Sequence, residues 1–403
     1  MKILQINAVW EIGSTGRNCK DIADYINTKT GHQCFTATAK GKPEDKGYLI
    51  SGKSDMKLHG LLSRLSGKQA HFSFNSTQKL LKYIDKIKPD IVHLNNLHGN
   101  YINFPLLMKY LAKNNIATVI TLHDCWFFTG KCCHYTSVKC NKWMKGCYEC
   151  PKLKQDNVSW FFDRTAYLWE EKKRLFENIS RLGVIGVSDW ITGEAQKSFL
   201  RCADEIIRIY NWIDLDLFRQ TDTSMFKEKY DLQNKYIILG VSSMWDEKKG
   251  LDKFIKLASM ISDDKVIVLV GKMLQKETLP SNIISAGSTE SIHELAEYYS
   301  MADAFVTLSL EETFGKVSAE ALACGTPVIC FDSTANRELI GNGCGRAVKP
   351  NDLEGILNAI DELEKCDRDL MKQQCRDYAV KMFSKDTNIS EYVSLYERLG
   401  DSR

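Results

Sequence analysis

The sequence predicts an α/β protein built from two domains. Its 403 residues exceed what one hydrophobic core ordinarily holds. Apolar runs of strand length recur along the chain and are separated by helical stretches, which is typical of parallel sheets with helices on their faces. The most informative of these units lies between two apolar runs, residues 304–308 and 327–331.

The segment between those two runs reads as a loop followed by a helix. Gly315 marks the turn into the helix, and Gly325-Thr326-Pro327 ends it. In an open α/β sheet this turn faces the crevice where ligands bind, and the helix start there favours an anion such as a phosphate. Glu312 and Glu320 would flank such a guest and could accept hydrogen bonds from sugar hydroxyls. On spacing alone, both glutamates equally fit solvated surface charges.

The same segment resembles the E-x7-E motif of retaining nucleotide-sugar glycosyltransferases of the GT-B type, in family 4 (glycosyl transferases group 1, bacterial polysaccharide-biosynthesis type). Phe314-Gly315 and the tail Glu320-Ala-Leu-Ala-Cys-Gly-Thr-Pro-Val328 carry the resemblance. It implies two facing Rossmann-like domains with a cleft between them. It also implies that the donor sugar and phosphates are held by Glu312 and by the backbone that follows it, and the ribose by Glu320. The donor-binding backbone residues are Phe314, Gly315, Lys316 and Val317.

The first strand begins at the N-terminus and leads to the turn Gly13-Ser14-Thr15-Gly16-Arg17, with a helix expected from Asn18. Glycines at such a turn let a ligand approach the backbone, although a tight turn explains them equally well. The string resembles the family's glycine-rich first loop. The resemblance makes Gly16 and Arg17 candidate donor contacts.

Composition narrows the class of protein. A hydrophobic content of 44% is ordinary for a globular chain, and a net charge of +3 gives no argument for nucleic acid. The sequence shows no signal-peptide pattern and no apolar run of membrane-spanning length, so we expect a cytoplasmic protein. In that compartment the 14 cysteines fit thiols or metal ligands better than disulfides.

Residues 53–68 form a basic amphipathic stretch, with leucines at near-helical spacing. Such a stretch fits a peripheral contact with the inner face of an anionic membrane, or with a lipid-linked acceptor. It fits equally an ordinary surface helix whose apolar face packs inward.

Two buried strands, near residues 89–94 and 116–122, end in polar residues. Three histidines, His93, His98 and His123, would then lie near the carboxyl edge of one sheet. Each also fits a structural role. His123 matches the family histidine that approaches the donor sugar, and His93 and His98 lie in a stretch that resembles the acceptor side.

An irregular insert, residues 125–151, contains six cysteines. Cys147-x-x-Cys150 has zinc-knuckle spacing, and Cys140 together with Cys132 or Cys133 could complete a structural zinc site, with His134 as a substitute ligand. Buried free cysteines are the alternative. The family resemblance implies no catalytic metal.

Next come a long helix expected over 160–180 and strands over 182–187 and 205–210. Asn211-Trp212-Ile213-Asp214 resembles the family's interdomain turn, with Trp212 where a glycine is usual. We therefore expect an acceptor-side domain over 1–210, a nucleotide-sugar-binding domain over 211–380, and a helix over 381–403 that crosses back to the first domain.

The loop after the strand at 236–241 resembles the family's diphosphate-binding loop. Lys249 and Gly250 match, but Met244 stands where the family has an arginine. A thioether does not replace a bidentate guanidinium, so Lys248, Arg17 or Arg346 would have to supply the charge. Further along, Ile284 and Ser285 are candidate contacts to the nucleobase.

The predicted reaction moves a hexose from a nucleotide sugar, with a UDP-sugar favoured, to a glycan or lipid-linked acceptor in surface polysaccharide biosynthesis, with retention of configuration. His123, Lys249 and Glu312 are the candidate catalytic residues. The first alternative is a nucleotide-sugar-binding protein with weak or no transferase activity, motivated by Met244. A glycogen-synthase-like or epimerising enzyme on the same fold is the second.

Overall fold

The computed structural model describes residues 1–41, 47–273 and 279–401, and the chain divides into two compact units. The first unit is Met1–Ile209 with Ile389–Arg403, and the second is Tyr210–Asn388. The sequence places the corresponding boundaries at 210/211 and 380/381. Residues 402 and 403 of the expected C-terminal helix lie outside the described residues.

The first unit is a seven-stranded parallel sheet in the order β3-β2-β1-β4-β5-β6-β7. Its strands are β1 (Lys2–Val9), β2 (Gln33–Lys40), β3 (Gly47–Leu49), β4 (Ile91–Leu94), β5 (Ala117–Leu122), β6 (Leu182–Gly186) and β7 (Glu205–Arg208). The central strands β4, β5 and β6 are buried along their whole length because helices cover both faces of the sheet.

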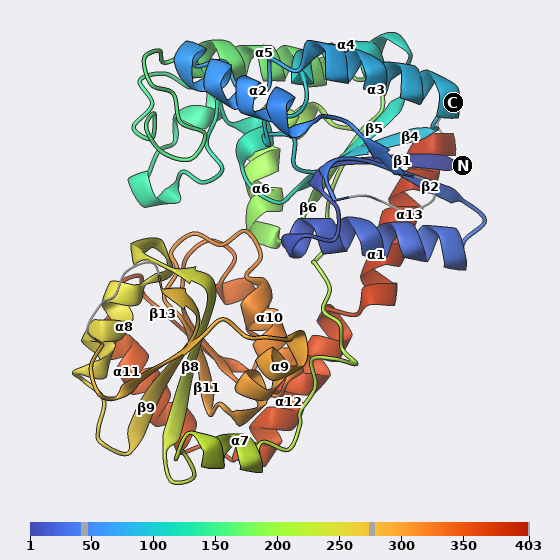
Figure 1. Ribbon diagram of the computed structural model, residues 1–403. Coiled ribbons are helices and arrows are strands. Elements are labelled where there is room, and N and C mark those ends of the chain that lie inside the picture. The colour runs from blue at the N-terminus through green and yellow to red at the C-terminus, as the bar shows by residue number, and fades with distance from the viewer. Residues whose placement is uncertain (42–46, 274–278, 402–403) are drawn as a thin grey trace. The chain divides into compact units, whose positions relative to one another are not determined.

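Helices α1 and α13 lie on one side of this sheet, and α3, α4 and α5 lie on the other (Figure 1). The helices of the unit are α1 (Gly13–Lys29), α2 (Lys53–Ser66), α3 (Phe74–Ile87), α4 (Phe104–Lys113), α5 (Thr165–Glu177), α6 (Asp189–Lys197) and, from residue 389 on, α13 (Lys385–Asp401). The returning part of α13 buries Tyr392, Leu395, Tyr396 and Leu399. It is therefore part of the core of the first unit.

The second unit is a six-stranded parallel sheet in the order β10-β9-β8-β11-β12-β13. Its strands are β8 (Tyr236–Trp245), β9 (Lys265–Met273), β10 (Ile283–Gly287), β11 (Ala304–Thr307), β12 (Val328–Phe331) and β13 (Gly345–Val348). Its helices are α7 (Ser224–Lys229), α8 (Leu251–Ala258), α9 (Ile292–Met301), α10 (Lys316–Ala323), α11 (Leu353–Glu364) and α12 (Arg368–Met382). Both units thus have the predicted α/β architecture.

Between β5 and α5 the chain runs from residue 123 to residue 164 with little regular structure. The segment contains three short 3₁₀ helices, Trp126–Phe128, Thr136–Val138 and Lys142–Met144. The helix expected from residue 160 begins only at Thr165, and Trp160, Phe161 and Phe162 before it are exposed. No described helix is long and apolar enough to cross a bilayer.

Candidate functional site

In the second unit, β8 and β11 are neighbours at the centre of the sheet, while the strands that follow them, β9 and β12, lie on opposite sides of this pair. The chain therefore leaves the two central strands in opposite directions, and a crevice forms at their carboxyl ends. The predicted donor-site segments, residues 246–250 after β8 and 308–315 after β11, both begin at this edge.

Lys249 and Glu312 meet there. The ammonium of Lys249 donates a hydrogen bond to Glu312 Oε1 at 2.5 Å. The Lys249 side chain is 39% exposed and that of Glu312 is 18% exposed, so the pair remains open to a ligand. Gly250 makes this approach feasible: its φ is +79°, and a Cβ there would lie 2.7 Å from Leu308 Cβ. The two predicted donor-binding side chains are thus brought together by the close packing of their loops.

Helix α10 begins directly after this loop. Gly315 precedes it with a φ of +82°, which is a left-handed conformation that favours glycine. No side chain caps the helix start, and first-turn amides have no partner inside a helix. The Phe314 side chain is buried against Tyr210 and Phe383, so the backbone at Phe314 is what remains for the donor contact predicted at this residue.

Two buried polar atoms beside this helix start lack a hydrogen-bond partner within the described residues: Thr313 Oγ1 and Asn336 Oδ1. Asn336 is fixed by donating through Nδ2 to the Ser309 carbonyl at 2.9 Å, and its Oδ1 lies 3.8 Å from an ideal Cβ on Gly315. Unpaired buried acceptors and donors are costly unless a ligand or water satisfies them. Sequence reasoning did not single out Thr313; a hydroxyl between Glu312 and Phe314 was the available signal.

Glu320 lies in α10 and is 6% exposed. It accepts a hydrogen bond from the Tyr299 hydroxyl at 3.0 Å. Burial, together with the nearby Glu320 carboxylate, raises the pKa of Tyr299 well above its ordinary value, so Tyr299 stays a donor. The glutamate is thus held in place from inside the unit.

Other predicted donor contacts are more dispersed. Ile284 and Ser285 lie in β10 at the edge of the sheet, two strands from β8. Met244 lies in β8 and is 42% exposed. Arg346, a candidate to replace the missing arginine, instead pairs with Glu362 through Nε at 2.9 Å.

In the first unit the corresponding central strands are β1 and β4. Helix α1 begins at Gly13 rather than after the glycine-rich string, so Gly16 and Arg17 belong to a helix and not to a loop, which corrects that prediction. Gly16 is buried and tightly packed, since a Cβ there would lie 3.0 Å from the Glu11 nitrogen. Arg17 is exposed.

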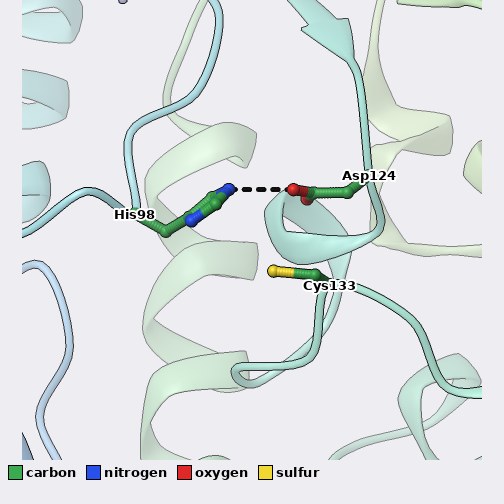
Figure 2. A group of neighbouring side chains, drawn as sticks. All are labelled: His98, Asp124 and Cys133. Carbon is green, nitrogen blue, oxygen red and sulfur yellow. Dashed lines mark hydrogen bonds and ion pairs between the residues drawn. The ribbon is translucent and has the colours of Figure 1, made fainter. Parts of the chain in front are cut away.

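His123 and His98 follow β5 and β4, and both are partly accessible. His123 Nε2 lies 3.0 Å from Asn95 Oδ1, and His98 Nε2 lies 2.8 Å from Asp124 Oδ2. Figure 2 shows His98 and Asp124 pointing toward one another, with Cys133 close to both. Burial opposes the charge on His98, but the Asp124 carboxylate outweighs it, and the pKa of His98 is raised.

His93 does not fit the acceptor-side role predicted for it. The residue is fully buried in β4, where Nε2 hydrogen-bonds Thr121 Oγ1 at 2.8 Å and Nδ1 hydrogen-bonds the Tyr396 hydroxyl at 2.8 Å. Burial, with a smaller effect of His123, lowers the pKa of His93 to about 3. This neutral histidine joins β4, β5 and α13 and has no surface to offer an acceptor.

The four predicted zinc ligands, Cys132, Cys140, Cys147 and Cys150, line one cavity of about 20 Å³ inside the irregular segment. Elsewhere in the first unit, three of the four leucines of α2 are exposed. Leu58, Leu61 and Leu65 are 55%, 43% and 38% exposed, whereas His59, Gly60 and Ser63 are the buried residues of the helix. Met56 and Leu62 are half-buried, so most, but not all, of the apolar face that the alternative packs inward is exposed.

Two family models match the sequence. The model "Glycosyltransferase Family 4" matches residues 20–217, and the model "Glycosyl transferases group 1" matches residues 222–382. Among curated proteins, the chain is 21% identical over 332 residues to a putative colanic acid biosynthesis glycosyl transferase, WcaC, of Escherichia coli K12. The match covers 77% of each chain.

Solved structures share the fold. Sucrose-phosphate synthase from Thermosynechococcus elongatus aligns with a TM-score of 0.72 at 17% identity and covers 100% of both chains. Anabaena Alr3699/HepE, solved in complex with UDP-glucose, aligns with a TM-score of 0.63 at 16% identity, over 98% of this chain and 99% of that one. At these identities the likeness concerns the fold.

Proposed function

Since the chain belongs to glycosyltransferase family 4 and has the GT-B fold, we propose that it moves a hexose from a nucleotide sugar to a glycan or lipid-linked oligosaccharide in surface polysaccharide biosynthesis, with retention of configuration. The observation that carries this proposal is the Lys249–Glu312 pair at the carboxyl ends of β8 and β11, directly before the start of α10.

The departing nucleoside diphosphate gains negative charge as the glycosidic bond breaks. Lys249 and the first amides of α10, at Lys316 and Val317, supply positive potential there, where it stabilises the transition state. Glu312 is positioned to accept from sugar hydroxyls once the ligand separates it from Lys249. Asn336 Oδ1 and Thr313 Oγ1 add two further polar contacts on the same side.

His123 would steady the donor sugar, and Glu320 would hold the ribose, as the family resemblance implies. The contacts to Asn95 and Tyr299 support these roles because each fixes a side chain before the ligand arrives. We assign the acceptor side to His98. Its raised pKa keeps a proton available near the carboxyl end of β4.

A UDP-sugar is the favoured donor, in keeping with the UDP-glucose complex of the structural relative. Thermal-shift measurements with UDP, GDP, ADP and their sugars test this choice. Stabilisation by one base and its sugars identifies the donor class, and a purely adenine- or guanine-selective response contradicts UDP. Anomeric analysis of the product tests the mechanism, since an inverted linkage is incompatible with retention.

A second candidate is a nucleotide-sugar-binding protein with little transferase activity. Met244 places a thioether where the family has a guanidinium, and Arg346 is paired with Glu362. Trp212, the other departure from the family, is buried with an ordinary negative φ and introduces no left-handed strain. Donor binding without acceptor-dependent nucleotide release would favour this candidate.

We propose a cytoplasmic protein that contacts the inner face of the membrane through α2 and the segment before α5. The two are joined by the Trp160 amide, which donates to the Arg64 carbonyl at 2.8 Å. The exposed apolar side chains of the two segments are Leu58, Leu61, Leu65, Trp160, Phe161 and Phe162, and Lys57 and Arg64 are exposed on α2.

Exposed leucines and aromatic rings gain roughly 1.5 to 3 kcal/mol each when fully buried, and each basic residue adds about 1 kcal/mol near an anionic surface. Co-sedimentation with vesicles tests the contact. We expect binding to phosphatidylglycerol-containing vesicles, weaker binding to phosphatidylcholine, and loss of binding in the Leu58→Ser/Leu61→Ser/Phe161→Ser variant. The matched control is Leu370→Ser, which alters an exposed leucine of α12. Equal sedimentation of both variants contradicts the proposal.

A further inference from the structure

We propose that the irregular segment between β5 and α5 is a structural zinc site, with Cys132, Cys140, Cys147 and Cys150 as its ligands. All four cysteines line the same cavity, although they are spread over 19 positions of a segment without strands or α-helices. The cavity has a volume of about 20 Å³, and about 10 to 15 Å³ is enough for one water molecule. The cavity is therefore large enough for a single ion. Four thiolates are the ligand set that structural zinc sites use.

Among the described residues, no three of these four sulfurs lie within 4.8 Å of one another, so a bound zinc ion would draw them closer together. The backbone amide of Gly130 donates to Cys147 Sγ at 3.3 Å, and the amide of Lys152, two residues after Cys150, donates to the sulfur of Cys150. The thiols of Cys132 and Cys150 already contact each other through a hydrogen bond. Amide donors to sulfur stabilise thiolates, which is the form that binds the metal.

Buried cations around the cavity provide a second, independent reason. Lys131 is 2% exposed and donates to the carbonyls of Lys152, Leu153 and Gln155, so its three hydrogen bonds all go to neutral groups. Lys172 of α5 is 4% exposed and donates to the carbonyls of Trp126 and Thr129.

A buried ammonium group is costly without nearby negative charge. The electrostatic neighbours of Lys131 are Cys150, Cys132, Asp156 and Asp163, and those of Lys172 are Cys147, Cys133, Asp124 and Cys132. Four thiolates around one Zn²⁺ leave a net charge of about −2, which the two ammonium groups would balance. With four neutral thiols, the compensation would come from Asp156 and Asp163 for Lys131 and from Asp124 for Lys172.

A rival metal group lies nearby. In the described part of the chain, the ligand atoms that come within 4.8 Å of one another in a group of three belong to His98, Asp124 and Cys133 (Figure 2). A divalent ion there would have to break the 2.8 Å hydrogen bond between His98 and Asp124. We therefore assign the metal to the cavity.

The assignment also separates two adjacent cysteines. Cys132 lines the cavity, while Cys133 lies with His98 and accepts a hydrogen bond from Asn157 at 3.6 Å. The ion would cross-link four points of the segment, in addition to the buried packing of Trp143 against Phe128 and Tyr135. It has no open coordination position and takes no part in the transfer reaction.

Metal analysis of the purified full-length chain tests the proposal. We expect about one zinc ion per chain in the wild type, and less than about a fifth of that in each of Cys132→Ser, Cys140→Ser, Cys147→Ser and Cys150→Ser. Cys133→Ser is the matched control, one residue from Cys132, and should keep its zinc. Loss of zinc in Cys133→Ser with retention in Cys140→Ser would overturn the assignment in favour of the His98 trio.

If a cysteine variant fails to fold, the zinc content of the wild-type protein still tests the proposal. Replacing zinc by Co²⁺ should give the visible and near-ultraviolet absorption bands of a tetrahedral thiolate site. A wild type that binds neither ion, or a count of free thiols showing Cys132 and Cys150 joined as a disulfide, overturns the proposal. Neither readout depends on transferase activity.

Discussion

At the scale of single residues, the candidate donor site rests on two long side chains that meet because a glycine lets their loops touch. Gly250 packs against Leu308, and Lys249 thereby reaches Glu312 at 2.5 Å. The positive charge of the Lys249 ammonium is partly balanced by the Glu312 carboxylate before a ligand binds. A diphosphate must compete with Glu312 for it, and the sugar hydroxyls then occupy the carboxylate that is released.

Lys249→Met should therefore lower kcat/KM by about 10²- to 10³-fold, because the charge that develops on the leaving diphosphate loses its nearest cation. Steady-state kinetics with the identified donor measures this. Lys256→Met, an exposed position on neighbouring α8, is the control and should behave as the wild type. Equal effects in both variants would mean that general charge, and not the Glu312 pair, matters.

Met244→Arg should have the opposite effect. A guanidinium at this 42% exposed position could form charge-assisted hydrogen bonds to the donor phosphates, and we expect the KM for the donor to fall by about tenfold. Met244→Leu retains the apolar character and serves as the control. An unchanged KM in Met244→Arg would show that another residue already supplies the charge.

At the scale of secondary-structure elements, the helix that follows β11 depends on one backbone conformation. Gly315 has a φ of +82°, yet the nearest atom to an ideal Cβ, Leu339 Cδ1, is 3.5 Å away. Space is thus available, and the requirement for glycine comes from the backbone alone. This distinguishes Gly315 from Gly250, where a side chain would collide with Leu308.

Gly315→Ala should cost roughly 1 to 2 kcal/mol of unfolding free energy and weaken donor binding, because the strain is relieved by turning the first amides of α10 away. Gly315→Asn should cost less, since asparagine tolerates the left-handed region. Urea unfolding and donor titration check both. A Gly315→Asn variant as damaged as Gly315→Ala points to side-chain volume instead.

The elements show which parts of the structure can be predicted from sequence. The run 304–308 became β11, Ala304–Thr307, because an apolar run bounded by turn residues leaves few alternatives. The glycines near residue 13 predict a loop, whereas α1 begins at Gly13 itself. In α2, the spacing of the leucines correctly places them on one face, but periodicity cannot tell whether that face meets a core or water.

In the candidate site too, local features could be predicted from sequence, whereas contacts between distant segments could not. Motif residues such as Lys249 and Glu312 could be identified, because their spacing and chemistry are local. Their mutual ion pair could not, since it depends on how Gly250 packs against Leu308, 58 residues away in sequence. His93 was misjudged for the reverse reason. A central parallel strand is buried on both faces, so a histidine within it gives no sign of pointing inward.

At the scale of the whole molecule, the ionisable core of the first unit sets how stability depends on pH. His93 is held neutral, with a pKa of about 3, and His59 with a pKa of about 4, both chiefly by burial. The unfolded chain protonates both near pH 6.5. Between pH 6.5 and about 4 the unfolded state therefore binds more protons, and stability falls as the pH falls.

His98 has the opposite effect on how stability depends on pH. Its pKa in the folded protein is raised by Asp124, so its contribution is present at pH values below the ordinary histidine pKa and is lost as the pH rises through the raised value. Asp124, with a pKa of about 2, adds stability that is lost only below pH 3.8. The two buried neutral histidines outnumber His98, so we expect a net loss of stability on acidification.

Urea unfolding at pH 7 and pH 5.5 measures this slope. Each neutral histidine contributes up to about 1.4 kcal/mol per pH unit, and His93→Gln should remove one such contribution while lowering stability at pH 7. His32→Gln, at a half-buried histidine that hydrogen-bonds Glu397, is the control. A slope unaltered by His93→Gln would show that His93 is not the titrating group.

The return of α13 to the first sheet has a consequence for how the protein is made. Tyr396 completes the hydrogen bonds of His93, and Arg181 donates to the Leu399 carbonyl. During translation, residues 1–209 emerge from the ribosome with this face of their core uncovered, and the uninterrupted second unit is synthesised before the missing helix appears. The first unit can therefore complete its core only after the second unit has been synthesised, so part of its apolar core stays uncovered until then.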